Sequence, residues 1–181
     1  MTRLKIPQRA ELPTHVRHFM SRLPSDPLLA MLSYSPATVE LFVRQGLAQS
    51  TGLRLSDRLR EVAILTVAGC CDCEYIAAQH EPMAATAGLS DTERAAIARK
   101  DFVGSDLTPL DRTVAEFVTA VIGAPRVSDR LFDQARGALT DREIIEVLQI
   151  CGYYWCLARV ATILDLKPTT IYGQMPHLGD T

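Results

Sequence analysis

The sequence predicts an all-α fold, a compact bundle of about six to eight helices. Three observations predict it. Helix-capping signals recur along the chain, and apolar residues follow them at helical spacing. Hairpin signals do not occur, because no Asn-Gly or Asp-Gly turn separates two alternating runs.

Capping chemistry marks where the helices begin. A short polar side chain at the start of a helix accepts a hydrogen bond from the first turn. Ser90-x-x-Glu93 and Thr140-x-x-Glu143 are capping boxes, in which the glutamate returns the bond. We expect Asp72 to cap the third helix. The expected helices cover residues 37–48, 57–69, 73–87, 91–100, 109–121, 129–137 and 141–164.

The last helix is apolar nearly all round between Ile144 and Ile163, which predicts burial in the centre or against another subunit. Residues 100–108 are expected to form a loop. We divide the chain into an N-terminal helical or extended arm (1–34), a helical domain (35–166) and a C-terminal tail (167–181). The tail is expected to be extended, because it carries Pro168 and Pro176.

Composition narrows the classes of function. The 181 residues are 48% hydrophobic and 22% charged, which suits a globular protein with a sizeable core. A net charge of −2 gives no reason to expect nucleic acid or a membrane surface as a partner. The sequence has neither a signal-peptide core nor a run of about 18 apolar residues. A cytoplasmic location is the default expectation.

The five cysteines are expected to be free thiols, because a cytoplasmic protein seldom carries a disulfide framework. Cys151 and Cys156 lie in an apolar stretch and are expected to be buried and inert. Cys70-x-x-Cys73 followed by His80 lacks a fourth ligand at zinc spacing, so no metal site is predicted. No nucleotide-binding motif occurs, and we expect no cofactor.

The candidate catalytic centre consists of Glu61, Cys73 and His80. In the first turn of a helix the unpaired amides favour a thiolate, so the pKa of Cys73 is expected to be lowered. His80 follows seven residues later on the same face, about 10 Å along the axis, with Ile76 between them. Glu61 on the preceding helix could orient the imidazole or accept its proton. A buried Glu–His pair can equally be a polar contact between two helices.

These residues occur in a pattern that resembles the carboxymuconolactone decarboxylase/AhpD-like superfamily. The resemblance rests on Arg60-Glu61, Cys73 and His80 at their spacing, and it continues through residues 82–90 and 152–159. It covers roughly residues 35–166. It implies an AhpD-like helical bundle, an active site at the centre defined above, and a homo-oligomer, which could be a trimer, a hexamer or a dimer.

Ile76 departs from the peroxidase-type members of that superfamily. In those members two cysteines lie three residues apart, and the second attacks the peroxide. Isoleucine forms neither a sulfenic acid nor a disulfide, so that dithiol cycle cannot run here. Cys70 and Cys73 form a second Cys-x-x-Cys, shifted toward the N-terminus. Cys71 is a poor resolving partner, because so short a ring is strained.

The first functional hypothesis is a cofactor-free lyase or isomerase on a small carboxylated or lactone substrate. His80 and Glu61 would transfer the proton. Arg60 or Arg159 would bind a substrate carboxylate, although either could instead form an ion pair. The substrate-binding wall would come from five further side chains, Tyr75, Ile76, Tyr153, Tyr154 and Trp155. The last three could also be plain core or a subunit contact.

Two other hypotheses stay open. One is a thiol-dependent hydroperoxide reductase that uses Cys73 with Cys70. The other is a non-catalytic oligomeric protein that binds a small molecule in the same pocket.

Overall fold

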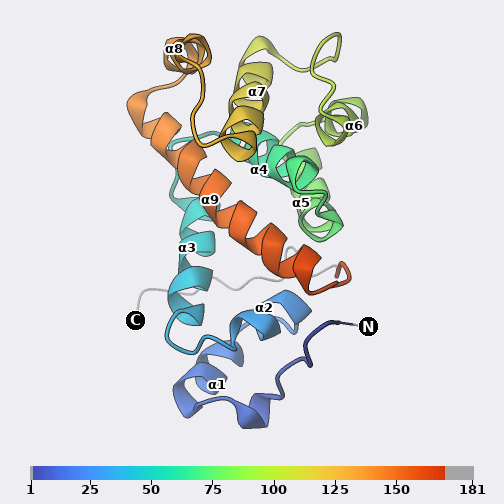
Figure 1. Ribbon diagram of the computed structural model, residues 1–181, viewed down its shortest axis with the longest axis vertical. Coiled ribbons are helices and arrows are strands. Elements are labelled where there is room, and N and C mark those ends of the chain that lie inside the picture. Colours follow the sequence, from blue (N-terminus) through green and yellow to red (C-terminus); the bar gives the residue numbers. More distant parts are fainter. Residues whose placement is uncertain (1, 170–181) are drawn as a thin grey trace.

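The computed structural model describes residues 2–169 of the chain. These residues form nine α-helices and one short 3-10 helix, Arg9–Glu11, and they contain no strand (Figure 1). The helices are α1 Thr14–Met20, α2 Pro27–Leu32, α3 Val39–Thr51, α4 Asp57–Cys70, α5 Glu74–Thr86, α6 Asp91–Arg99, α7 Pro109–Gly123, α8 Asp129–Ala138 and α9 Asp141–Ile163. The predicted all-α fold class is confirmed.

Helix starts were well predicted where a capping box is present. Ser90 and Glu93 exchange the two expected bonds at the start of α6, and Thr140 and Glu143 do so at the start of α9. Asp72 is a correction. It lies in the left-handed region at φ 48°, in the turn after α4, and Cys73 is the N-cap of α5 instead. Aspartate adopts positive φ more readily than most residues, which suits Asp72 to this turn.

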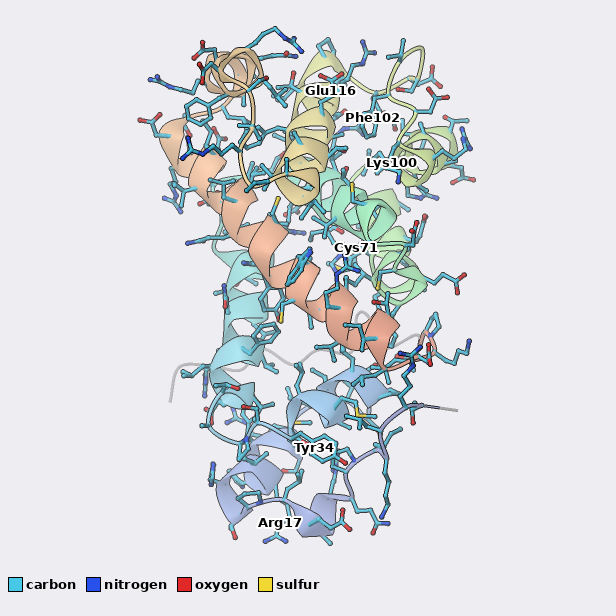
Figure 2. All side chains as sticks on the ribbon, viewed as in Figure 1. Arg17, Tyr34, Cys71, Lys100, Phe102 and Glu116 are labelled. Carbon is cyan, nitrogen blue, oxygen red and sulfur yellow. The ribbon has the colours of Figure 1, made fainter. Side chains whose placement is uncertain are left out.

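The N-terminal arm holds two helices whose bounds the sequence analysis did not give, α1 and α2. Asp26 caps α2 by accepting hydrogen bonds from Leu28 N at 2.9 Å and Leu29 N at 3.0 Å, and Pro27 takes the first helical position. Tyr34, labelled in Figure 2, donates to the carbonyl of Lys5 at 2.7 Å. This bond ties the first residues of the arm to the segment after α2.

α4 is the central helix, because it contacts α5, α6, α7 and α9. All ten residues from Leu59 to Ala68 are buried, as expected for a helix surrounded by others. α9 crosses the molecule from the α8 end toward α2 and packs on the other side of the same core (Figure 1). A second, smaller apolar cluster joins α1 to α3 through Val16, Phe19, Val39 and Val43.

α9 is buried along one face only. Ile145, Leu148, Trp155 and Ile163 on the other face are between 38% and 55% exposed. By length and composition alone α9 could cross a membrane, and it is the one such helix among residues 2–169. Half of its most apolar window is buried in the protein. That is weak evidence for a span, since a core helix passes the same test.

Candidate functional site

The site begins with a contact between α4 and α5. The turn at residues 71–73 folds α5 back against α4, so that Glu61 on the first helix meets His80 on the second. His80 Nδ1 lies 2.8 Å from Glu61 Oε2, and the two side chains are 3% and 0% exposed. With a carboxylate as the partner, Nδ1 carries the proton, which fixes the ring orientation. The pairing expected from the sequence is therefore present.

Arg60 holds the other side of the Glu61 carboxylate. Its Nε donates to Glu61 Oε1 at 3.1 Å, and its Nη1 donates to Asp57 at 2.7 Å and to the carbonyl of Ser50 at 3.2 Å. The two oxygens of Glu61 are thus divided between a guanidinium and an imidazole. A buried carboxylate with both oxygens bonded is held in one position.

His80 lies on the wall of a cavity of about 330 Å³ that is lined by residues of α2, α3, α5 and α9. The lining is mostly apolar. It consists of Asp26, Leu28, Leu29, Leu32, Val43, Gly46, Ser50, Tyr75, Ile76, Gln79, His80, Met83, Tyr153, Tyr154 and Leu157. Tyr75, Ile76, Tyr153 and Tyr154 of the expected substrate-binding wall are in it, whereas Trp155, which is exposed, is not. Ile76 therefore lines the same cavity as His80.

Aromatic rings form the α9 side of this cavity. Tyr154 meets His80 edge-on at a centroid distance of 5.1 Å, and Tyr153 stacks on Phe42 of α3 at 4.5 Å. Gly46 makes this packing possible, since a Cβ there would lie 2.3 Å from Tyr153 Oη. A glycine in the middle of α3 costs helix stability, and the close approach of the tyrosine accounts for it.

Asp26, Tyr75 and Gln79 of the lining form a polar cluster with Thr169. Tyr75 and Thr169 donate their hydroxyls to Asp26 Oδ2, Thr169 at 2.6 Å. Burial, followed by the bond to Asp26, raises the pKa of Tyr75. Sequence reasoning missed Asp26 and Gln79. An Asp-Pro helix start was the one signal available, and it predicts a cap rather than a cavity.

Cys73 lies outside this cavity. It is 3% exposed and lines a separate cavity of about 180 Å³ together with Glu81 and Arg94. Burial raises the pKa of its thiol, although the backbone amides of Ile76 and Tyr75 act in the opposite direction. The expected lowering of the Cys73 pKa is therefore wrong, because desolvation outweighs the helix start.

The remaining thiols are free, as Cys73 is. Cys70 Sγ lies 3.8 Å from Thr119 Oγ1 of α7. Cys151 is buried, as expected, and burial raises the pKa of its thiol to about 12. Cys156 is only half-buried, so the expected burial of this thiol is wrong. Within residues 2–169 no three His, Cys, Asp or Glu side chains gather in a way that could hold a metal ion.

Neither arginine proposed for substrate binding lines the cavity. Arg60 is engaged by Glu61 and Asp57, which is the ion-pair alternative left open above. The Arg159 guanidinium lies over the Trp155 ring at 5.5 Å, on the outer side of α9.

The fold is similar to that of AhpD-like proteins of known structure. A peroxidase-related AhpD-core protein from Ralstonia eutropha superposes with a TM-score of 0.74 at 19% identity, covering 97% of both chains. A peroxidase-related protein from a Silicibacter species gives 0.78 at 17% identity, over 96% of this chain and 95% of the other. The debrominase Bmp8, in complex with 2,3,4-tribromopyrrole, gives 0.73 at 15% identity over 93% and 94%. No protein-family model and no curated protein matches the sequence significantly.

Proposed function

We propose that the chain is a cofactor-free lyase or isomerase that moves a proton on a small substrate bound in the 330 Å³ cavity. One observation carries the proposal: the buried His80 lies on the cavity wall with its Nδ1 held by Glu61 at 2.8 Å. Histidine is the side chain best suited to give and take a proton near neutral pH.

His80, Glu61 and Arg60 have different roles in this mechanism. Because Nδ1 is occupied by Glu61, the proton exchanged with a substrate passes through Nε2 of His80. Glu61 positions the ring and stabilises the imidazolium that forms when Nε2 accepts the proton. Arg60 balances the charge of Glu61 from behind and keeps the carboxylate in place.

The cavity lining favours the lactone over the carboxylated substrate. Among the described residues Asp26 supplies a carboxylate and His80 an imidazole to the lining, and neither Lys nor Arg lines it. A carboxylate would enter an apolar space without a fixed cation and beside a second carboxylate, which is costly. A neutral lactone or carbonyl compound avoids both costs.

The experiment is the His80→Gln variant, assayed by the uptake of solvent deuterium into a panel of neutral lactones and ketones. Removal of a general base lowers turnover by about 100- to 10,000-fold. His18→Gln is the matched control, because His18 is exposed on α1. Turnover by His80→Gln equal to that of the control would remove His80 from the mechanism.

A thiol-dependent hydroperoxide reductase is the alternative function that the sequence suggests. Against it stand the position of Cys73 outside the His80 cavity and its raised pKa. Titration of free thiols before and after exposure to peroxide tests it, since a Cys70–Cys73 disulfide removes two thiols. If no substrate turns over and no disulfide forms, the third hypothesis, a non-catalytic binding protein, takes the place of both.

We also propose that the chain forms a homo-oligomer through the exposed apolar face of α9, at Leu148 and Trp155 among others. Apolar side chains repeated along one helix face are typical of a contact with another chain. Sedimentation of the wild type and of Trp155→Arg tests it, and the variant should sediment as a smaller species. The cytoplasmic location stays a prediction from the sequence.

A further inference from the structure

The Gln79 amide is fixed in one orientation by the chain segment after α9. Its Nε2 donates to the carbonyl oxygen of Thr169 and, at 2.9 Å, to Thr169 Oγ1. A carbonyl oxygen can only accept, so the NH₂ group and not the amide oxygen must face it. Gln79 Oε1 is then left buried, and it has no hydrogen-bond partner within residues 2–169. A buried acceptor without a donor is costly.

The neighbouring carboxylate is already satisfied. Asp26 Oδ1 accepts from the backbone N–H groups of Leu28 and Leu29, and Oδ2 accepts from the hydroxyls of Tyr75 and Thr169. Gln79 is 4% exposed, and it lines the cavity beside His80. Gln79 Oε1 is therefore a buried acceptor, on a residue of this wall, that lacks a donor within residues 2–169.

The cavity also limits the size and charge of an occupant. A volume of about 330 Å³ is roughly twice that of an apolar cavity known to hold benzene, so a bicyclic ring system fits. The lining carries the Asp26 carboxylate and, among described residues, no lysine or arginine, which disfavours anions.

We propose that the cavity binds an uncharged, mainly apolar molecule, up to bicyclic size, that donates an N–H or O–H hydrogen bond to Gln79 Oε1. This inference rests on the proposed function, because it describes the substrate of the same site. It adds that a donor group is recognised next to the place of proton transfer.

Two probes of equal size test the donor. Indole carries an N–H, and benzofuran carries an oxygen at the same ring position. Titration calorimetry with the wild type should give an affinity for indole about five- to thirtyfold higher than for benzofuran. The apolar effect alone favours benzofuran, so the expected order cannot come from hydrophobicity. Indole-2-carboxylate should bind more weakly than indole, because of its charge. Equal affinities for indole and benzofuran, or no binding of either, contradict the proposal; a water molecule would then satisfy Oε1.

Two variants separate the acceptor from the segment that holds it. Gln79→Met removes Oε1 and should bring the ratio of the two affinities close to one. Thr169→Val is the matched control, because it loosens the same contact and leaves Oε1 in place. It should keep the ratio, even if both affinities change. A ratio in Gln79→Met equal to that in Thr169→Val also contradicts the proposal.

The His80→Gln variant distinguishes this inference from the proposed function. It should lose turnover and keep the preference for indole over benzofuran. Unchanged turnover with a retained preference would contradict the proposed function alone. If His80→Gln loses turnover, but neither the variant nor the wild type prefers indole over benzofuran, the inference alone is contradicted.

Discussion

Two arginines on α4, two residues apart, each hold a pair of carboxylates, and they differ in what else they touch. Arg58 binds Asp111 Oδ2 at 2.8 Å and also binds Glu93, which joins α4 to α6 and α7. Arg60 binds Asp57 and Glu61. Because two residues turn an α-helix by more than half a turn, the two side chains leave α4 in different directions.

The difference lies in the partners of the carboxylates. Glu93 and Asp111 close the capping boxes of α6 and α7, so the Arg58 cluster connects helix starts. Glu61 instead forms a hydrogen bond with His80, which lies on a cavity wall. The Arg58 cluster is therefore a structural joint, by which we mean an ion-pair cluster that connects the starts of α6 and α7 to α4. The cluster around Arg60 has the same residue types but belongs to the candidate site. The two clusters differ because Glu61 also binds His80, a titratable residue on a cavity wall. They do not differ in the number of ion pairs.

The largest effect is expected from breaking the structural joint. Arg58→Met leaves Glu93 and Asp111, which are 7% and 1% exposed, without their cation. Loss of one partner of a buried ion pair lowers the free energy of unfolding by about 3–5 kcal/mol. Urea denaturation followed by circular dichroism measures it, and turnover per folded molecule should stay at the wild-type value.

Arg44→Met is the control for that experiment. Arg44 forms an i,i+4 pair with Glu40, whose side chain is 45% exposed, so the change should cost about 0.5 kcal/mol or less. If Arg58→Met costs no more than Arg44→Met, the Arg58 cluster is not a structural joint.

The next effect comes from Glu61→Gln, which changes the charge of the candidate site and keeps its shape. An amide still reaches His80 but no longer stabilises an imidazolium, so turnover should fall about tenfold or more. The free energy of unfolding should fall by about 1–2 kcal/mol, because a buried bond to Arg60 is weakened. Activity assays beside urea denaturation measure both. A large loss of stability with normal turnover would make Glu61 part of a second structural joint.

The smallest effect is a pH dependence of stability that arises at the structural joint. Burial alone would raise the pKa of Glu93, but its bonds to Ser90 and to Arg58 together lower it. A carboxyl whose pKa is lower in the folded state stabilises the fold above its unfolded pKa, about 4.3, and this contribution is lost as the pH falls. The free energy of unfolding of the wild type should therefore decrease toward acid pH, and that of Arg58→Met should decrease less. If the free energy of unfolding changes with pH equally in the wild type and in Arg58→Met, the pKa of Glu93 does not depend on Arg58.

The sequence predicted the features that depend on neighbouring residues. The capping boxes at Ser90 and Thr140 are local, and both appear as expected. The Glu61–His80 pairing depends on α5 folding back on α4, and the resemblance to a known motif made it predictable. The pKa of Cys73 was predicted in the wrong direction, because burial depends on the whole fold while the helix start is local.

Contacts between distant residues escaped prediction for the same reason. Asp26 meets Tyr75 across 49 positions, and Gln79 meets Thr169 across 90. No spacing rule connects such pairs. The six-residue helix α2 was also missed, since a helix of that length carries too few apolar positions to show a period.

The cavity between the two apolar clusters has a consequence for how this protein can change. Glu61 and His80 lie on α4 and α5, whose apolar residues belong to the larger cluster, whereas Val43 on the α3 wall belongs to the smaller one. A substitution at Val43 changes the α3 wall of this cavity, whereas Glu61 and Arg60 lie on α4. If the proposed function holds, substitutions on the α3 wall would change which molecule fits the cavity, while the proposed proton-transfer pair on α4 and α5 stays in place.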